Sequence, residues 1–144
     1  MTAREFLKKY EYALDRVELC REQYIIESLQ IDAIRSASDN DGMPHGNGKS
    51  DPTANKAVKL SNRLQRLIDA EQEALEIQQN IFDVVMQVGG IESKVLVARY
   101  LKLMKWEDVC KEVNYSWFVV RQAWHDGEKK LQTILDKSNN NIQL

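Results

Sequence analysis

The chain is poor in the residues that interrupt helices or crosslink chains. Its 144 residues include two prolines, six glycines and two cysteines. Three of the glycines lie within residues 38–50, so the rest of the chain favours long helices. Cys20 and Cys110 are far apart and each falls on an apolar helical face. We therefore expect free thiols in a reducing compartment and exclude a disulfide framework.

The sequence also lacks membrane and secretion signals. No segment approaches the roughly 18 continuous apolar residues of a membrane span. The first residues, Met-Thr-Ala-Arg-Glu, contain no apolar region of the kind found in signal peptides. These absences predict a cytoplasmic protein that has no contact with a membrane.

Signals for catalysis are equally scarce. The only histidines are His45 and His125, and there is no Gly-rich phosphate loop, Cys/His ligand spacing or plausible nucleophile–base pair. The run 39–42 resembles part of a calcium loop, but no Glu follows at the required position. We expect no enzyme activity, no cofactor and no metal site.

The charge balance limits the strength of any nucleic-acid binding. The formal net charge is −2, of which residues 1–88 contribute −4 and residues 89–144 contribute +2. Affinity for phosphates rises with the number of cations engaged. One copy of the chain is therefore not expected to bind tightly, and a dimer that doubles the contacts is more plausible.

Two long amphipathic helices are predicted over residues 1–88. Thr2 and Glu5 form a capping box, and apolar residues then recur every three or four positions to about Arg35. Residues 38–50 predict a mobile loop, after which Asp51 caps a second helix with Pro52 at its first position. Gly89-Gly90 ends that helix. Apolar residues of the second helix form three neighbouring rows. The central row has strict seven-residue spacing and consists of Leu60, Leu67, Ala74, Ile81 and Val88. One flanking row contains Leu64 and Val85, and the other contains Ile68, Leu75 and Phe82.

The matching lengths of the two helices predict an all-α fold that begins with a long antiparallel hairpin. Both apolar stripes are wide, so two helices alone leave much of their apolar surface uncovered. We expect the hairpin to mediate oligomerisation, as a homodimer that forms a four-helix bundle or as a higher oligomer.

A third helix over 91–104 leads into residues 106–125, which have the pattern of a helix-turn-helix unit. The first helix of such a unit needs apolar and small residues where it meets the second. The turn favours Gly or Asn in a left-handed conformation, followed by an apolar residue, and the second helix needs a cap and inward-facing residues. The residues at these positions are Val109, Cys110, Val113, Asn114, Tyr115, Ser116, Val120 and Ala123. An ordinary helical hairpin is the alternative. These patterns together predict a trihelical domain over 89–137 and a flexible tail over 138–144.

The face of the second helix opposite Val120 and Ala123 is the candidate DNA-reading surface. Arg121 can donate two hydrogen bonds to guanine, and Gln122 can pair with adenine. Phosphate contacts position a protein on DNA without reading sequence. The remaining candidates are Trp117, Phe118 and His125 on this face, and Ser116, Lys105, Lys129 and Lys130 for phosphates. The alternatives are a solvated surface charge for each lysine and the edge of the domain core for Trp117 and Phe118.

Five short motifs stand in the C-terminal part: Arg99-Tyr-Leu, Trp106-Glu-Asp-Val, Asn114-Tyr-Ser116, Arg121 and Lys130-Leu131. Together they resemble the C-terminal signature of late-gene transcriptional regulators of the ArpU and RinA type, encoded by phages and prophages of Gram-positive bacteria. The segment is also similar to region 4 of sigma-70 factors, matched by Ser116 and Val120-Arg121-Gln122. In the first half, the resemblance covers Met43-Pro44 and Ser50-Asp51-Pro52.

The resemblance implies a sequence-specific DNA-binding regulator that activates late genes in a bacterial cytoplasm, with double-stranded DNA and RNA polymerase as partners. A second hypothesis is an interaction protein whose sigma-like unit binds a protein target. Trp117, Phe118 and the weak positive charge favour it, whereas Arg121 and Gln122 favour DNA. A third is a small terminase subunit for DNA packaging, which also joins a helix-turn-helix to a helical hairpin.

Overall fold

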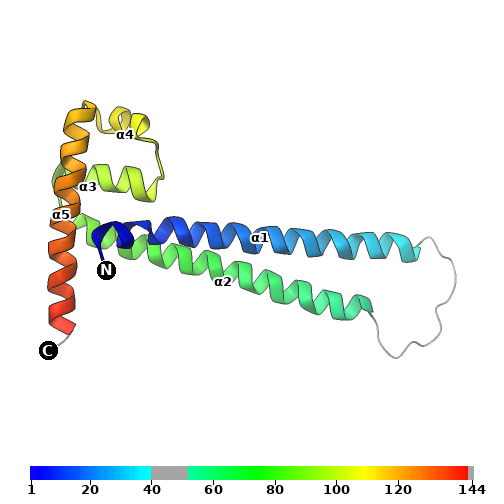
Figure 1. Cartoon of the computed structure of the whole chain (residues 1–144). Helices are drawn as coiled ribbons and strands as arrows, with labels where there is room; N and C mark the ends of the chain where they lie inside the picture. Colours follow the sequence, from blue (N-terminus) through cyan, green and yellow to red (C-terminus); the bar gives the residue numbers. More distant parts are fainter. Residues whose placement is uncertain (40–51, 143–144) are drawn as a thin grey trace. The chain divides into compact units, whose positions relative to one another are not determined.

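The structure, a computed structural model, describes residues 1–39 and 52–142. These residues form an all-α fold without strands, as the sequence predicts (Figure 1). By packing, the chain divides into a hairpin unit, Asp15–Glu73, and a terminal unit, Met1–Leu14 with Ala74–Leu144. The elements are the α-helices α1 (Ala3–Asp39), α2 (Pro52–Met86), α3 (Gly90–Leu96), α4 (Trp106–Val113) and α5 (Trp117–Ile142), and the π-helix η1 (Val97–Leu101).

The hairpin unit contains antiparallel stretches of α1 and α2. Three ion pairs join the two helices, and the residue number on α2 falls as that on α1 rises. The paired residues are Arg16 with Glu73, Arg21 with Glu71, and Glu27 with Arg63. Val17 and Ile31 of α1 and Leu67 and Ala70 of α2 are buried in this unit. The hairpin predicted from the sequence is therefore present.

The core of the terminal unit draws on both ends of the chain. Phe6 and Leu7, from the first turns of α1, belong to one buried cluster with Ile81 and Val85 of α2. The same cluster includes Leu96, Tyr100, Leu101 and Leu131. A packing unit that includes residues 1–14 differs from the division at residue 88 expected from the sequence. The first turns of α1 therefore share one buried cluster with residues of α2, α3, η1 and α5.

The capping box predicted at the start of α1 is present, whereas the cap predicted at Asp51 lies outside the described residues. The backbone N–H of Thr2 donates to Glu5 Oε2 at 3.0 Å, and the backbone N–H of Glu5 donates to Thr2 Oγ1 at 3.2 Å, which completes the capping box. Pro52 is the first residue of α2. Most of the loop expected over 38–50 lies outside the described residues, and positions 38 and 39 belong to α1. Within residues 1–39 and 52–142, no helix has both the length and the apolar character needed to cross a membrane.

Two predicted helix ends are wrong. The third helix, expected to reach residue 104, changes at Val97 into a π-helical turn and ends at Leu101. Leu103 then has a positive φ of 55°, and the Arg99 side chain donates to the backbone oxygen of Met104 at 2.8 Å. At the other end, α5 runs to Ile142, so the tail expected from residue 138 is helical as far as that residue.

Candidate nucleic-acid interface

The connection between α4 and α5 has helix-turn-helix geometry. Asn114 adopts the left-handed conformation predicted for the turn, with φ 61° and ψ 44°. Its backbone N–H donates to the oxygen of Cys110 at 2.9 Å, which ends α4. Two residues later, the oxygen of Ser116 accepts from the backbone N–H of Val120 at 3.0 Å and begins α5. The prediction for Tyr115 is wrong: it is not packed under the turn but 53% exposed.

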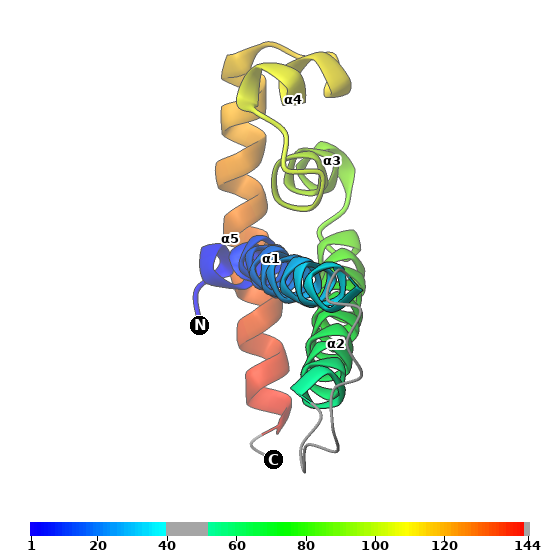
Figure 2. The same ribbon diagram turned by 90° about the vertical axis from the view of Figure 1, so that its right-hand side faces the viewer.

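The inward face of the motif matches the sequence prediction. Val109, Val120 and Ala123 are buried in one cluster with Val95 and Ala98 of the preceding segment. Cys110 and Val113 pack partly buried against this cluster. Figure 2 shows α5 running beside α3, with α4 near the first turns of α5. The three helices therefore fix which side of α5 faces solvent.

Gly127 explains how closely α3 and α5 approach. A Cβ atom added there would lie 3.1 Å from Leu96 Cδ1 and 3.3 Å from Glu92 Cβ. Because Leu96 is fully buried, it has little room to retreat. The absence of a side chain at residue 127 thus permits the close contact between α3 and α5.

The outward face of α5 carries most of the predicted DNA contacts. One row on this face, with intervals of three or four residues, consists of Phe118, Gln122, His125 and Lys129. Arg121 lies beside this row, and all five side chains are exposed. Among the described residues, Arg121 makes no ion pair. Gln122 Nε2 donates to the Asp126 carboxylate at 3.4 Å and 3.5 Å. This face presents groups that can pair with base edges.

The aromatic residues on this face differ in how firmly they are held. Trp117 contacts Trp106 edge to face at a centroid distance of 5.3 Å, and Trp106 in turn packs on Trp124 at 4.6 Å. Trp117 is nevertheless 45% exposed, so it is both the edge of the core and part of the surface. Phe118 is 78% exposed and is surface only. The His125 ring stacks on Trp124 at 4.8 Å.

The predicted phosphate contacts are not equally available. Lys105 and Lys129 are exposed, and Lys105 directly precedes α4. Lys130 Nζ instead forms an ion pair with Glu92 Oε1 at 3.0 Å. The pKa of Glu92 is lowered, first by its own backbone N–H and then by Lys130. A phosphate must therefore compete with Glu92 for this lysine.

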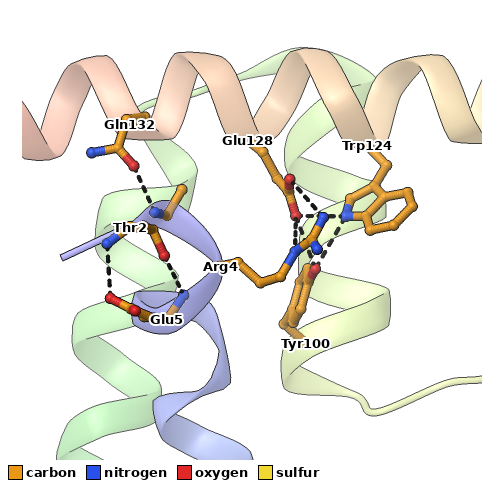
Figure 3. A network of polar contacts seen from close by, with 8 residues as sticks. Thr2, Arg4, Glu5, Tyr100, Trp124, Glu128 and Gln132 are labelled. Carbon is orange, nitrogen blue, oxygen red and sulfur yellow. Dashed lines mark hydrogen bonds and ion pairs between the residues drawn. The ribbon is translucent and has the colours of Figure 1, made fainter.

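A polar network that the sequence analysis missed attaches α1 to α5 (Figure 3). The Glu128 carboxylate accepts hydrogen bonds from Arg4 at 3.3 Å, from the Tyr100 hydroxyl at 3.1 Å and from Trp124 Nε1 at 2.9 Å. Nearby, the backbone N–H of Ala3 donates to Gln132 Oε1 at 2.7 Å. No local pattern could reveal these pairs because Arg4 and Glu128 are 124 residues apart.

The environment of the Tyr100 hydroxyl leads us to expect that the protein loses stability at alkaline pH. Burial raises its pKa above the ordinary value of 10.0, and Glu128 also raises it, although the Trp124 hydrogen bond acts in the opposite direction. When folding raises the pKa of a group, the protonated group stabilises the folded state. This contribution is fully present at pH values below the pKa in the unfolded chain, and it is lost as the pH rises through the pKa in the folded protein. We expect the free energy of unfolding to fall above about pH 10 more steeply in the wild type than in Tyr100→Phe. Urea denaturation across this pH range measures the two slopes, and equal slopes would contradict the prediction.

No three His, Cys, Asp or Glu side chains gather as a metal site requires within the part of the chain that the structure describes. Comparison of the chain with protein-family models, curated proteins and solved structures finds no match. Its function must therefore be inferred from its own geometry.

Proposed function

We propose that this protein binds double-stranded DNA sequence-specifically through the first turns of α5 and regulates transcription. The observation that supports this most directly is the exposed pair Arg121 and Gln122 one turn after a tight, left-handed helix connection. Helix-turn-helix proteins place these turns in the major groove. Arginine and glutamine there match guanine and adenine edges.

Phosphate contacts complete the proposed interface. Lys105 and Lys129 supply exposed cations on either side of the reading residues in the sequence, and Ser116 marks the start of α5. The partners are double-stranded DNA and RNA polymerase, and the setting is a bacterial cytoplasm. By the resemblance to phage late-gene regulators, the outcome is activation of late genes.

Selection from a random double-stranded oligonucleotide library tests the proposal. The full-length protein is expected to enrich a defined motif, with binding that weakens as salt rises. Arg121→Ala/Gln122→Ala should lower affinity for that motif at least about tenfold, because each lost bidentate pair costs roughly 1–3 kcal/mol. Binding to random DNA should change little.

A matched control removes the same residue types elsewhere. Arg66→Ala/Gln23→Ala deletes an exposed arginine and an exposed glutamine from the hairpin unit and should leave the motif unchanged. If the wild-type protein enriches no motif at any salt concentration, the DNA-reading function is wrong.

A second candidate function is the binding of a protein target. Phe118 supports it, because a phenylalanine 78% exposed is unusual on a soluble surface and is joined in sequence by Trp117 and Tyr115. Aromatic residues of this kind anchor protein interfaces. Phe118→Ala would then abolish capture of the target while Arg121→Ala would not. A small terminase subunit remains a third candidate, supported only by the joining of a helix-turn-helix to a hairpin.

A further inference from the structure

One exposed face of α2 carries no charged side chain. It consists of two rows in which residues recur every seven positions, close to two turns of the helix, so successive members of a row lie near one another on the helix surface. We call it the uncharged face: Ser61, Ile68, Leu75 and Phe82 in one row, and Val58, Gln65, Gln72, Gln79 and Met86 in the other, all exposed. Every charged residue of α2 lies outside these rows. Exposed helix faces ordinarily carry charge, whereas the cores of protein interfaces are depleted of it.

The row of α2 that packs inside the chain contributes no residue to the uncharged face. Leu67 and Ala74 are buried, as expected for the seven-residue row that packs inside the chain. Ile68, Leu75 and Phe82 form the flanking row and remain 46%, 53% and 43% exposed. Beside Phe82 the terminal unit has two surface hollows, of about 510 and 400 Å³, that also share Val97 and Lys102 in their walls. Apolar side chains and the space to receive others therefore occur together.

The charges of α2 identify what can cover this face. Residues 52–67 contain four Lys or Arg and no acid, while residues 68–86 contain five Asp or Glu and no base. Arg63, Glu71 and Glu73 already pair with α1. The other charges are Lys56, Lys59 and Arg66 in the basic half and Asp69, Glu76 and Asp83 in the acidic half. Packed helices lie 8–10 Å apart, close to the Debye length of about 8 Å at physiological salt. A second α2 running antiparallel would place each basic half beside an acidic half. A parallel one would place like charges together.

Side-chain sizes support the same arrangement. An antiparallel register that sets Ile68 against the partner's Leu75 also sets Ser61 against the partner's Phe82. Each large aromatic then meets a small residue, as close packing requires. The symmetry axis falls beside Gln72, and the same surface is used by both copies, as in a two-fold dimer.

We propose that the uncharged face of α2 binds the same face of a second copy of this chain, antiparallel, about an axis beside Gln72. This specifies the helix, the direction and the register of the dimer. It does not depend on DNA binding, so either proposal can fail without the other.

Cysteine crosslinking tests the register. Gln65, Gln72 and Gln79 lie in one row and can each be replaced by cysteine in a Cys20→Ser/Cys110→Ala background of the full chain. A disulfide requires Cα atoms within about 7 Å. In the proposed pairing only Gln72→Cys meets itself, because two copies of residue 65 or of residue 79 are about 20 Å apart along the axis. A mixture of Gln65→Cys and Gln79→Cys should also crosslink.

Each outcome decides the proposal. Crosslinking of Gln72→Cys alone, together with the mixed pair, supports it. Self-crosslinking at all three positions means a parallel dimer, and none at any position means that this face is not the interface. Both results overturn the proposal.

Sedimentation of the full chain provides an independent measurement. The wild type should sediment as a dimer, and Ile68→Lys/Leu75→Lys should become monomeric with an unchanged helical circular dichroism spectrum. The matched control Leu19→Lys/Leu29→Lys alters two exposed leucines of α1 and should remain dimeric. A monomeric wild type, or dissociation by the control to the same extent, overturns the proposal.

Discussion

Leu7→Ala is expected to lower the free energy of unfolding of the terminal unit by about 3 kcal/mol. Leu7 is fully buried in a cluster with Leu96, Leu131 and Ile81, so truncation leaves a cavity where four helices meet. The three tryptophans all lie in this unit, and their fluorescence during urea denaturation measures its stability.

Leu19 supplies the control on the same helix. Its side chain is 66% exposed, so Leu19→Ala should change the free energy of unfolding by no more than about 0.5 kcal/mol. If Leu7→Ala is as mild as the control, the first turns of α1 do not belong to the core of the terminal unit.

Glu128→Ala is expected to destabilise the same unit by about 2 kcal/mol, because it removes a largely buried acceptor of hydrogen bonds from three residues. The Tyr100 hydroxyl loses its acceptor, while Trp124 Nε1 keeps the Tyr100 oxygen at 3.0 Å as a partner. Arg4 is about half exposed, so water partly compensates for its lost ion pair. The cost therefore arises mainly from the Tyr100 hydroxyl, which is left without an acceptor.

A double-mutant cycle separates these contributions. Arg4→Ala alone should cost less than about 1 kcal/mol, since its side chain is solvated. In the Glu128→Ala background, Arg4→Ala should lower the free energy of unfolding by still less, because the partner of Arg4 is already absent. Tyr100→Phe should lose most of its own effect in that background. Equal costs for Arg4→Ala and Glu128→Ala would show that the ion pair, and not the buried donors, carries the energy.

The parts of the fold that the sequence predicts are those specified by neighbouring residues. Thr2 and Glu5 are three positions apart and cap α1 with no help from the rest of the chain. Asn114 ends α4 because it tolerates a left-handed conformation better than most residues. The buried row through Leu67 and Ala74 follows from seven-residue spacing alone.

The parts that the sequence does not predict depend on contacts between distant residues. Glu128 meets Arg4 across 124 residues, and Lys130 meets Glu92 across 38. Tyr115 has the apolar character the turn favours, but it does not belong to the cluster that contains Val109 and Val120, and it remains exposed. The π-helical turn at Val97 likewise has no signature in local propensity.

The candidate interface is likewise predicted only in part by the sequence. Helical periodicity places Arg121, Gln122 and Phe118 on the outer face of α5. Periodicity does not reveal that Trp117 contacts Trp106 while Phe118 contacts solvent. That difference makes Phe118 the residue whose replacement distinguishes a DNA target from a protein target.

The shared cluster of Phe6, Leu7 and Leu131 also constrains how the protein is made. A ribosome synthesises the N-terminus first, and domains generally fold as units during synthesis. Here Phe6 and Leu7 must wait until Leu131 has been synthesised before all of their partners exist. The terminal unit therefore cannot close its core until α5 has been synthesised, while the hairpin unit, Asp15–Glu73, can form before that point.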